Sequence, residues 1–334
     1  MIKFFRHIRR TLINQNQMGK YFKYAIGEIF LVVIGILIAL QINNWNEQRK
    51  INTQVEEMFY KTFRELEYNI NRAQNLIAFY KPKDTLYYIV RNDTYDIEDP
   101  NQKRPCFPCI LSAFESINIS TEAANNLYTY NTRVTSELKT IIEDIDLFYK
   151  DYKVQLDDMD EEMEIMVDDY NSMLRDTKTW YSAFNNKKFA QYEKEIINYY
   201  ISDPFFENWV AQYEQLAYYH RADAIAFISD AFKIYKRMSE YFDFKKSKAL
   251  MVDTDKFKYF LGVYQGKMGN LTVSLKEDNY YLSLINGKRV QESQLYFDSD
   301  STGYSRLGYI KFNSKTLRLS AGSRGKFEFS KEIE

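Results

Sequence analysis

Histidine is almost absent from this sequence, and its scarcity excludes several kinds of site. The 334 residues include only His7 and His220. Zinc sites built from several histidines and mechanisms that use two histidines are therefore excluded after the first fifty residues, where His220 stands alone. A Ser-His-Asp triad would have to use His220. Because His220 falls on the apolar face of an expected helix, we interpret it as a buried structural residue.

Cysteine is equally scarce, and both cysteines lie in one short segment. Cys106 and Cys109 belong to the sequence Arg104-Pro-Cys-Phe-Pro-Cys109, within a polar stretch. The same spacing occurs in thioredoxin-like redox sites, where the first cysteine follows a strand and begins a helix of a βαβ unit. No such strand is readable before Cys106. The sequence therefore favours a structural disulfide, or two loop thiols, over a redox pair.

Acidic residues are missing before Glu28, and an apolar run extends from Ile29 to Leu40. Residues 25–45 would span roughly 30 Å as a helix, about the thickness of the hydrocarbon core of a bilayer. We predict a transmembrane helix over this range. A cleaved secretory signal is the competing interpretation, but the preceding basic region is long and Ile38-Ala-Leu-Gln41 is a poor cleavage site.

The basic residues predict the orientation of this span. Six of them precede it, whereas only Arg49 and Lys50 follow closely, so residues 1–24 are expected in the cytoplasm and the bulk of the chain in the periplasm. The apolar residues Ile2, Phe5, Ile8 and Leu12 follow helical spacing. Residues 1–24 therefore form either a basic amphipathic segment on the inner leaflet or an orientation signal alone.

One face of the predicted span is small and polar. It consists of Glu28, Gly35, Ala39, Asn43 and Asn46, spaced seven, four, four and three residues apart. Gly35 and Ala39 would let a second helix approach closely, and the asparagines would hydrogen-bond across such a contact. The face predicts association with other membrane-protein subunits, of the same or a different kind. Glu28 alternatively suggests an accessory role in an ion-driven complex.

The first fifty residues resemble a family of bacterial single-pass membrane proteins that carry a domain of unknown function. The resemblance rests on the start Met1-Ile-Lys-Phe-Phe-Arg6, on Tyr24-Ala-Ile-Gly-Glu28 and on Val32-Val-Ile-Gly-Ile-Leu-Ile-Ala-Leu-Gln-Ile-Asn-Asn-Trp-Asn-Glu47. It implies an inner-membrane protein that faces the periplasm, and it does not imply any biochemical activity.

Charge and composition divide the rest of the chain into two domains. Residues 1–44 carry a net charge of +5, residues 45–250 of −9 and residues 251–334 of +3. We predict an acidic helical bundle at residues 46–245 and a β-rich domain at residues 246–334. The acidic middle region argues against nucleic acid as a partner.

The middle region has helical periodicity. We expect helices from Val55 to Tyr80, near Thr121 to Thr132, and from Asp203-Pro204 onward. A heptad-type pattern from Leu138 to Met173 predicts a core or oligomer seam formed by Leu138, Ile142, Ile145, Leu156, Met159, Met163 and Met166. The simplest assembly is an antiparallel bundle or coiled coil. Eight acids between Asp157 and Asp169 surround this seam, and we interpret them as a solvated face, because no glycine is present for a calcium loop.

Short segments rich in aromatic and branched residues follow Lys248. We expect strands at residues 257–264, 271–275, 280–285, 294–297, 304–312, 317–320 and 326–329, with a hairpin turn at Asn286-Gly287. Their spacing predicts a small antiparallel barrel or curled sheet. The run Gly262 to Leu284 also resembles the lipocalin-like modules of some periplasmic hydrolases, which implies an assembly or binding role.

These patterns predict an α+β protein: one transmembrane helix, a periplasmic antiparallel helical bundle and a C-terminal barrel-like domain. We assign no catalytic residue, cofactor or metal site, because the sequence contains no recognisable combination of a nucleophile, a base and metal ligands. The leading hypothesis is a non-enzymatic structural or interaction subunit of a cell-envelope assembly, anchored in the inner membrane. The alternatives are an envelope sensor whose β-domain recognises a glycan, peptide or lipid, and the accessory role of Glu28.

Overall fold

The fold is α+β, with a series of helices followed by a closed barrel of antiparallel strands. The computed structural model describes residues 10, 18–96, 99, 101, 105–185, 189–245, 254–276, 279–297, 299–305, 307–313, 315–320 and 326–332. Contacts divide the chain into two units, Met1–Glu57 and Met58–Glu334. Of the basic amphipathic segment expected at residues 1–24, only Arg10 and Met18–Tyr24 are among the described residues.

Helix α2 extends without interruption over Met18–Tyr80. It is the one helix among the described residues that is long and apolar enough to cross a membrane. Eleven apolar side chains between Ile29 and Ile42 are each 46–64% exposed, and they lie on all sides of the helix. The apolar side chains from Ile29 to Ile42, in the range predicted to span the membrane, therefore do not belong to a hydrophobic core of this chain.

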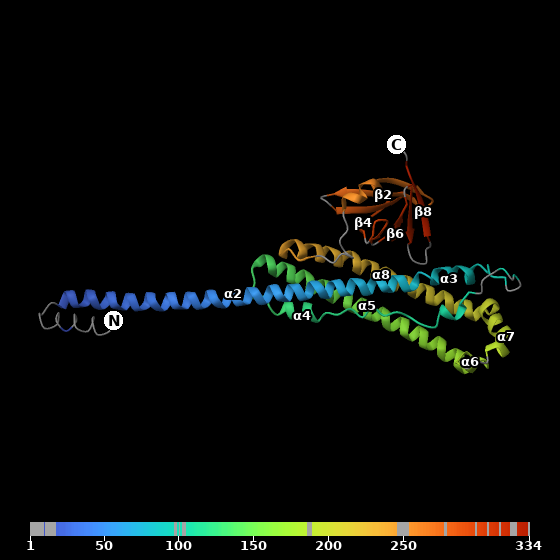
Figure 1. Ribbon diagram of the computed structural model, residues 1–334, viewed down its shortest axis with the longest axis horizontal. Helices are drawn as coiled ribbons and strands as arrows, with labels where there is room; N and C mark the ends of the chain where they lie inside the picture. The colour runs from blue at the N-terminus through green and yellow to red at the C-terminus, as the bar shows by residue number, and fades with distance from the viewer. Residues whose placement is uncertain are drawn as a thin grey trace. The chain divides into compact units, whose positions relative to one another are not determined.

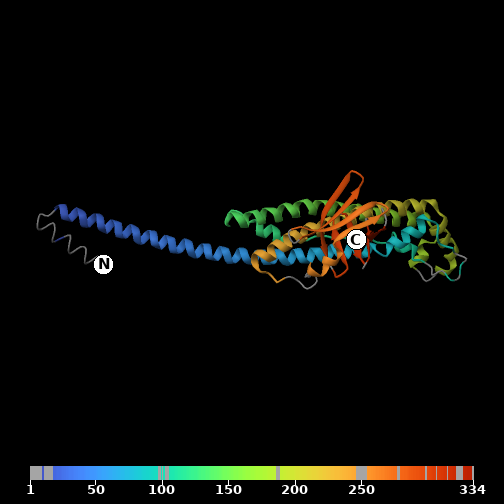
Figure 2. The same ribbon diagram turned by 90° about the horizontal axis from the view of Figure 1, so that it is seen from above.

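The second unit contains the remaining helices, which are α3 (Lys83–Arg91), η1 (Phe107–Cys109), α4 (Glu122–Tyr128), α5 (Ser136–Thr177), α6 (Tyr181–Asn185), α7 (Phe189–Ser202) and α8 (Pro204–Phe242). Helices α5 and α8 run alongside the later part of α2 in both views (Figures 1 and 2). Thr135 caps the start of α5. Asp203 and Pro204 begin α8, as the sequence predicts.

Helices α5 and α8 pack antiparallel, and their aromatic contacts establish the register. Phe148 contacts Phe227 at a ring-centroid distance of 5.2 Å, and further along, Tyr170 contacts Trp209 at 5.5 Å. From the first contact to the second, the residue numbers increase along α5 and decrease along α8, as antiparallel packing requires. Helix α2 joins this core through Phe63, whose ring stacks on Tyr235 of α8 at 4.2 Å.

The C-terminal part forms one sheet that closes on itself. Its strands are β1 (Gly262–Gly266), β2 (Gly269–Lys276), β3 (Asn279–Asn286), β4 (Arg289–Phe297), β5 (Thr302–Ser305), β6 (Gly308–Phe312), β7 (Thr316–Ser320) and β8 (Lys326–Lys331). Each strand pairs with the next, and β1 pairs with β8, so the barrel has up-and-down topology. The predicted turn at Asn286-Gly287 joins β3 to β4, and Gly287 supplies the positive φ of 59° that the turn requires.

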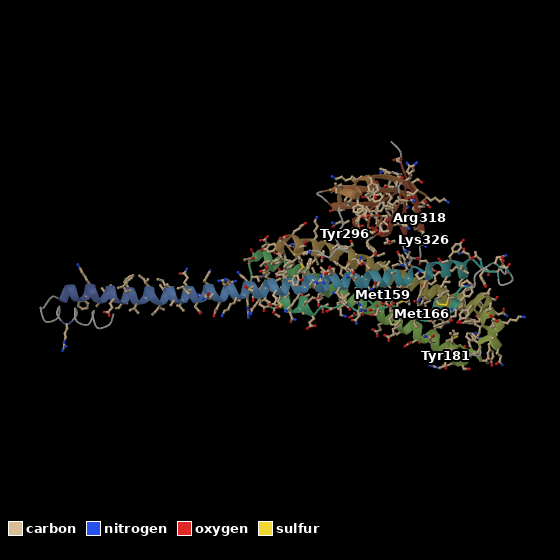
Figure 3. The ribbon with its side chains drawn as sticks, viewed as in Figure 1. Met159, Met166, Tyr181, Tyr296, Arg318 and Lys326 are labelled. Carbon is tan, nitrogen blue, oxygen red and sulfur yellow. A yellow bond between two sulfur atoms is a disulfide. The ribbon has the colours of Figure 1, made fainter. Side chains whose placement is uncertain are left out.

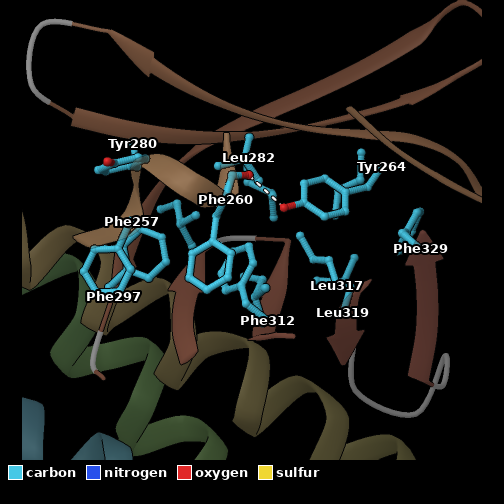
Figure 4. Packing of buried hydrophobic residues seen from close by; sticks show 14 residues of the cluster. Phe257, Phe260, Tyr264, Tyr280, Leu282, Phe297, Phe312, Leu317, Leu319 and Phe329 are labelled. Carbon is cyan, nitrogen blue, oxygen red and sulfur yellow. Dashed lines mark hydrogen bonds between the residues drawn. The ribbon is translucent and has the colours of Figure 1, made fainter. Parts of the chain in front are cut away.

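Side chains fill the barrel interior (Figure 4). The 3₁₀ helix η2 (Thr254–Phe260) contributes Phe257 and Phe260, which stack on Phe297 at 3.7 Å and on Phe312 at 4.1 Å. The Tyr264 hydroxyl donates to the Phe260 carbonyl at 2.8 Å, which ties η2 to β1. The core therefore consists of residues from the strands and from the segment before them.

Two strand predictions were wrong in detail. Residues 257–260, expected as the start of a strand, form η2, because Phe257 and Phe260 are three residues apart and both enter the barrel. The single strand expected at residues 304–312 is two strands, β5 and β6, paired with each other from Thr302↔Lys311 to Ser305↔Gly308. Helices α3, α6 and α7 were not predicted, because they have only 9, 5 and 14 residues and do not form long periodic runs.

Candidate functional site

An irregular segment, Ile110–Ser120, lies along the bundle, and its backbone is bound by side chains from the helices. Lys83 Nζ of α3 donates to the carbonyls of Ile110 and Ala113, both at 2.9 Å. Arg72 of α2 donates to the carbonyls of Ser116, at 2.9 Å, and Ile117. Asn69 donates to the Ser120 carbonyl at 2.7 Å and accepts from the Ser120 amide at 2.9 Å. We call Ile110–Ser120 the strap.

Asp160 of α5 binds the middle of the strap. Its carboxylate accepts from Ser116 Oγ at 2.6 Å and from the backbone amides of Ile117 and Asn118, both at 3.2 Å. Asn118 has a left-handed backbone conformation, with φ of 41°, so the chain bends sharply around this carboxylate. The carboxylate of Asp160 thus accepts three hydrogen bonds from the strap.

The same carboxylate also contacts the single histidine of the bundle. Asp160 Oδ1 lies 2.9 Å from His220 Nε2, and His220 Nδ1 lies 3.0 Å from the Tyr80 hydroxyl. Burial raises the pKa of Tyr80, so its hydroxyl stays protonated. The carboxylate of Asp160 can only accept a hydrogen bond. Nε2 then carries the proton that faces Asp160. His220 is completely buried.

This arrangement brings a serine, a histidine and an aspartate together, but not in the order that a hydrolase needs. In a catalytic triad the serine donates to the histidine, and the aspartate holds the other ring nitrogen. Here Ser116 donates to Asp160, and the second nitrogen of His220 meets Tyr80. No nucleophile is activated by this arrangement, so the cluster positions the strap between α2, α5 and α8.

Lys83 is the second buried charge of the cluster. Besides the strap carbonyls, its Nζ donates to the Tyr213 hydroxyl of α8 at 2.7 Å, and it lies 4.4 Å from the centroid of the Phe79 ring. The Tyr213 hydroxyl in turn donates to the Ala113 carbonyl at 2.7 Å. Burial lowers the pKa of Lys83 to about 7.

Ion pairs join α3 to α8 around these buried groups. Arg221 donates two parallel hydrogen bonds of 3.0 Å to the carboxylate of Asp84, and Arg91 donates to Glu214 at 3.0 Å. The guanidinium of Arg221 also lies 5.8 Å from the centroid of the Tyr80 ring. Bidentate geometry of this kind holds an orientation as well as a distance. Among the residues that the structure describes, no three His, Cys, Asp or Glu side chains form a group that could hold a metal ion.

The predicted seam lies inside the bundle of a single chain. Ile142, Ile145, Leu156, Met163 and Met166 are buried, while Leu138 and Met159 are half-buried. Figure 3 labels Met159 and Met166 on α5. The five buried residues therefore belong to the core that α5 forms with α8.

The acidic run of α5 is not uniformly solvated. Seven of its eight acids are exposed, but Asp160 is half-buried and makes the bonds described above. The expectation of a solvated face was therefore wrong for Asp160. Its position four residues after Leu156, on the border of the seam, is the only sequence signal for its inward direction. Nothing in the sequence indicates that Lys83, Arg72 and Asn69 bind the same segment as Asp160.

The membrane-face residues and the cysteines lie apart from this cluster. Gly35, Ala39, Asn43 and Asn46 are exposed on α2, and Glu28 is half-exposed there. Cys106 and Cys109 form a disulfide at η1. No protein-family model, curated protein or solved structure matches the chain.

The first prediction concerns Asp160. We expect Asp160→Asn to lower the free energy of unfolding by about 3 kcal/mol at pH 7, because a partly buried carboxylate loses its charge-assisted bonds. Urea unfolding measures this. The exposed neighbour provides the control, Asp158→Asn, which should change stability by less than about 0.5 kcal/mol.

Comparison of the wild type with Asp160→Asn also gives a test that depends on pH. Burial by itself raises the pKa of Asp160, but the bonds from His220 and Ser116 outweigh it and hold the pKa below its usual value. A lowered carboxylate pKa stabilises the fold above the ordinary value and is lost as pH falls. The difference between wild type and Asp160→Asn should therefore shrink below about pH 4. A difference that grew in acid would contradict this account.

The second prediction concerns Lys83. Its pKa of about 7 lies below the ordinary lysine value, so the unfolded chain binds more protons between about pH 7 and pH 10. Stability should rise with pH in this window. Relative to Lys83→Met, we expect the wild type to gain about 2 kcal/mol between pH 7 and pH 9 in urea unfolding. Lys81→Met changes an exposed lysine of the same turn, and the difference in stability between it and the wild type should not vary with pH. A difference between the wild type and Lys83→Met that stayed constant from pH 7 to pH 9 would refute the lowered pKa.

Proposed function

We propose that this chain is a non-enzymatic interaction subunit of a cell-envelope assembly, anchored in the inner membrane by residues 25–45 of α2. The N-terminus lies in the cytoplasm, and the bundle and barrel are presented to the periplasm. The lipid bilayer and other membrane-protein subunits are its partners. The chain acts by holding these domains at the membrane and by docking.

The exposed apolar surface of α2 is the observation that carries the proposal. From Ile29 to Ile42, apolar side chains face outward on every side of the helix. Moving one such side chain out of water is worth roughly 1.5–3 kcal/mol, so leaving the whole run in water is strongly unfavourable. A bilayer removes this surface from water, and the helix satisfies its own backbone hydrogen bonds there.

The interior of the second unit supports a role in presentation rather than chemistry. His220, the one imidazole of this unit, is buried and bound between Asp160 and Tyr80. A barrel that recognises a small apolar ligand needs an interior cavity, whereas Phe257, Phe260 and the strand side chains occupy this one. Docking at outer surfaces is therefore favoured over the sensor hypothesis.

The small face of α2 supports association within the membrane. Apart from its chain neighbours and the backbone of its own helix, Gly35 has no atom within 4 Å of the position where a Cβ would stand, so a second helix can approach its backbone closely. Ala39 and Asn43 extend this exposed face. The sequence from Tyr24 to Glu47 also leads us to propose membership of the single-pass family that it resembles.

The third prediction tests anchoring. The full chain should remain in the membrane fraction after an alkaline carbonate wash, because an inserted helix is not released by removing surface charge. The double variant Ile34→Arg/Leu37→Arg should be extracted, since each arginine at a helix centre costs about 2.5–3.5 kcal/mol of insertion. Gln48→Arg/Asn52→Arg adds the same charges beyond the span and should stay membrane-bound. Extraction of the wild-type chain would refute the anchor.

The fourth prediction tests association. In a Cys106→Ser/Cys109→Ser background, we expect Gly35→Cys to form an oxidative crosslink in native membranes, either to a second copy or to another subunit. Leu37→Cys, two residues away and on a different side of the helix, should not crosslink. Equal crosslinking at both positions, or at neither, would argue against a specific contact through the small face.

A further inference from the structure

The disulfide between Cys106 and Cys109 lies at the surface, although the residues around it are buried. Both cysteines are exposed. Phe107, between them, is 4% exposed, and Ile110, directly after them, is completely buried. The short turn therefore points its two sulfur-bearing residues outward while its apolar side chains face the bundle.

This turn is held in place without the disulfide. The Phe107 ring lies parallel to the Tyr200 ring of α7 at 6.2 Å and meets the edge of Tyr95 at 5.5 Å. Lys83 binds the Ile110 carbonyl at 2.9 Å, and the Cys109 amide donates to the Cys106 carbonyl at 3.0 Å. A crosslink across so short a loop also contributes the least to stability. Opening the sulfur–sulfur bond would thus leave the turn where it is.

A small apolar hollow lies beside the turn that carries the disulfide. It has a volume of about 40 Å³ and is lined by Pro105, Pro108, Ile196, Ile197, Tyr95 and Tyr200, with Phe107. Pro105 and Pro108 each directly precede a cysteine, and neither has a backbone N–H to offer. The hollow can therefore take one small apolar side chain of a polypeptide that presents its own cysteine to the disulfide.

We propose that Cys106 and Cys109 form a thiol–disulfide exchange site for a protein dithiol whose cysteine is followed by a small apolar residue. A thiolate of the partner attacks one sulfur of the Cys106–Cys109 bond, a mixed disulfide forms, and the other cysteine leaves as a thiolate that takes up a proton. The partner's second thiolate then attacks the mixed disulfide. Two electrons pass from the partner dithiol, which becomes a disulfide, to Cys106 and Cys109, which become thiols.

This site goes beyond the proposed anchoring and does not depend on it, because the groups that hold the turn and line the hollow all belong to the second unit. An exposed disulfide is the kind that exchanges readily, whereas a structural one is shielded or closes a long loop. The apolar hollow adds selectivity, because only a partner with a matching side chain gains contact area there.

The test uses the full chain in detergent and two dithiol peptides, Cys-Gly-Gly-Cys-Val and Cys-Gly-Gly-Cys-Ser, with blocked ends. Reduction of the chain is followed by acid quenching, alkylation and mass spectrometry. We expect the valine peptide to react about fivefold faster, because its side chain enters the hollow. As a control, both peptides should reduce oxidised glutathione at the same rate.

Two further measurements make the outcome decisive. Pro108→Ser, at the half-exposed rim, should reduce the fivefold preference to about twofold or less, whereas dithiothreitol should reduce both proteins equally fast. The reduced wild-type chain should keep its near-ultraviolet circular dichroism, because the turn is held by Phe107 and Lys83. Equal rates with the two peptides, or loss of tertiary structure on reduction, would overturn the proposal and make the disulfide structural.

Discussion

Backbone groups that are removed from water must find hydrogen-bond partners, and this requirement explains how the strap is held against the bundle. The strap, Ile110–Ser120, has neither a helix nor a strand to pair its amides and carbonyls. Side chains of the surrounding helices take that role, with Lys83, Arg72 and Asn69 on one side and Asp160 on the other. The polar and charged side chains of this cluster are therefore explained by the polypeptide backbone that they bind.

The barrel meets the same requirement in a different way. Its strands pair in sequence and close through β1 and β8, so the backbone satisfies itself and the core is built mainly from apolar side chains. Phe257 and Phe260 complete that interior from outside the sheet. The second unit thus combines a bundle held by polar side chains with a barrel that has an apolar core, and α8 contacts the barrel through Phe232, whose ring stacks on Tyr296 at 5.2 Å.

The periodic parts of the sequence predicted the fold well. The heptad pattern indicated α5, the apolar repeat after Asp203-Pro204 indicated α8, and Asn286-Gly287 indicated a β-hairpin, because each of these signals is local. Phe257 to Phe260 was misread as a strand, since a short aromatic run has no decisive period. The cluster around Asp160 was missed for another reason: seven of the acids beside it do face solvent, and the sequence does not say which one turns inward.

The sequence by itself determined the long apolar helix, the acidic helical region, the β-rich end and the scarcity of histidine, because composition and spacing are properties of neighbouring residues. Only the tertiary structure decided that Asp160 meets His220, that Lys83 meets Tyr213, and that the disulfide lies exposed beside an apolar hollow. Lys83 and Tyr213 are 130 positions apart, and contacts of that kind depend on how the helices pack rather than on any pattern along the chain.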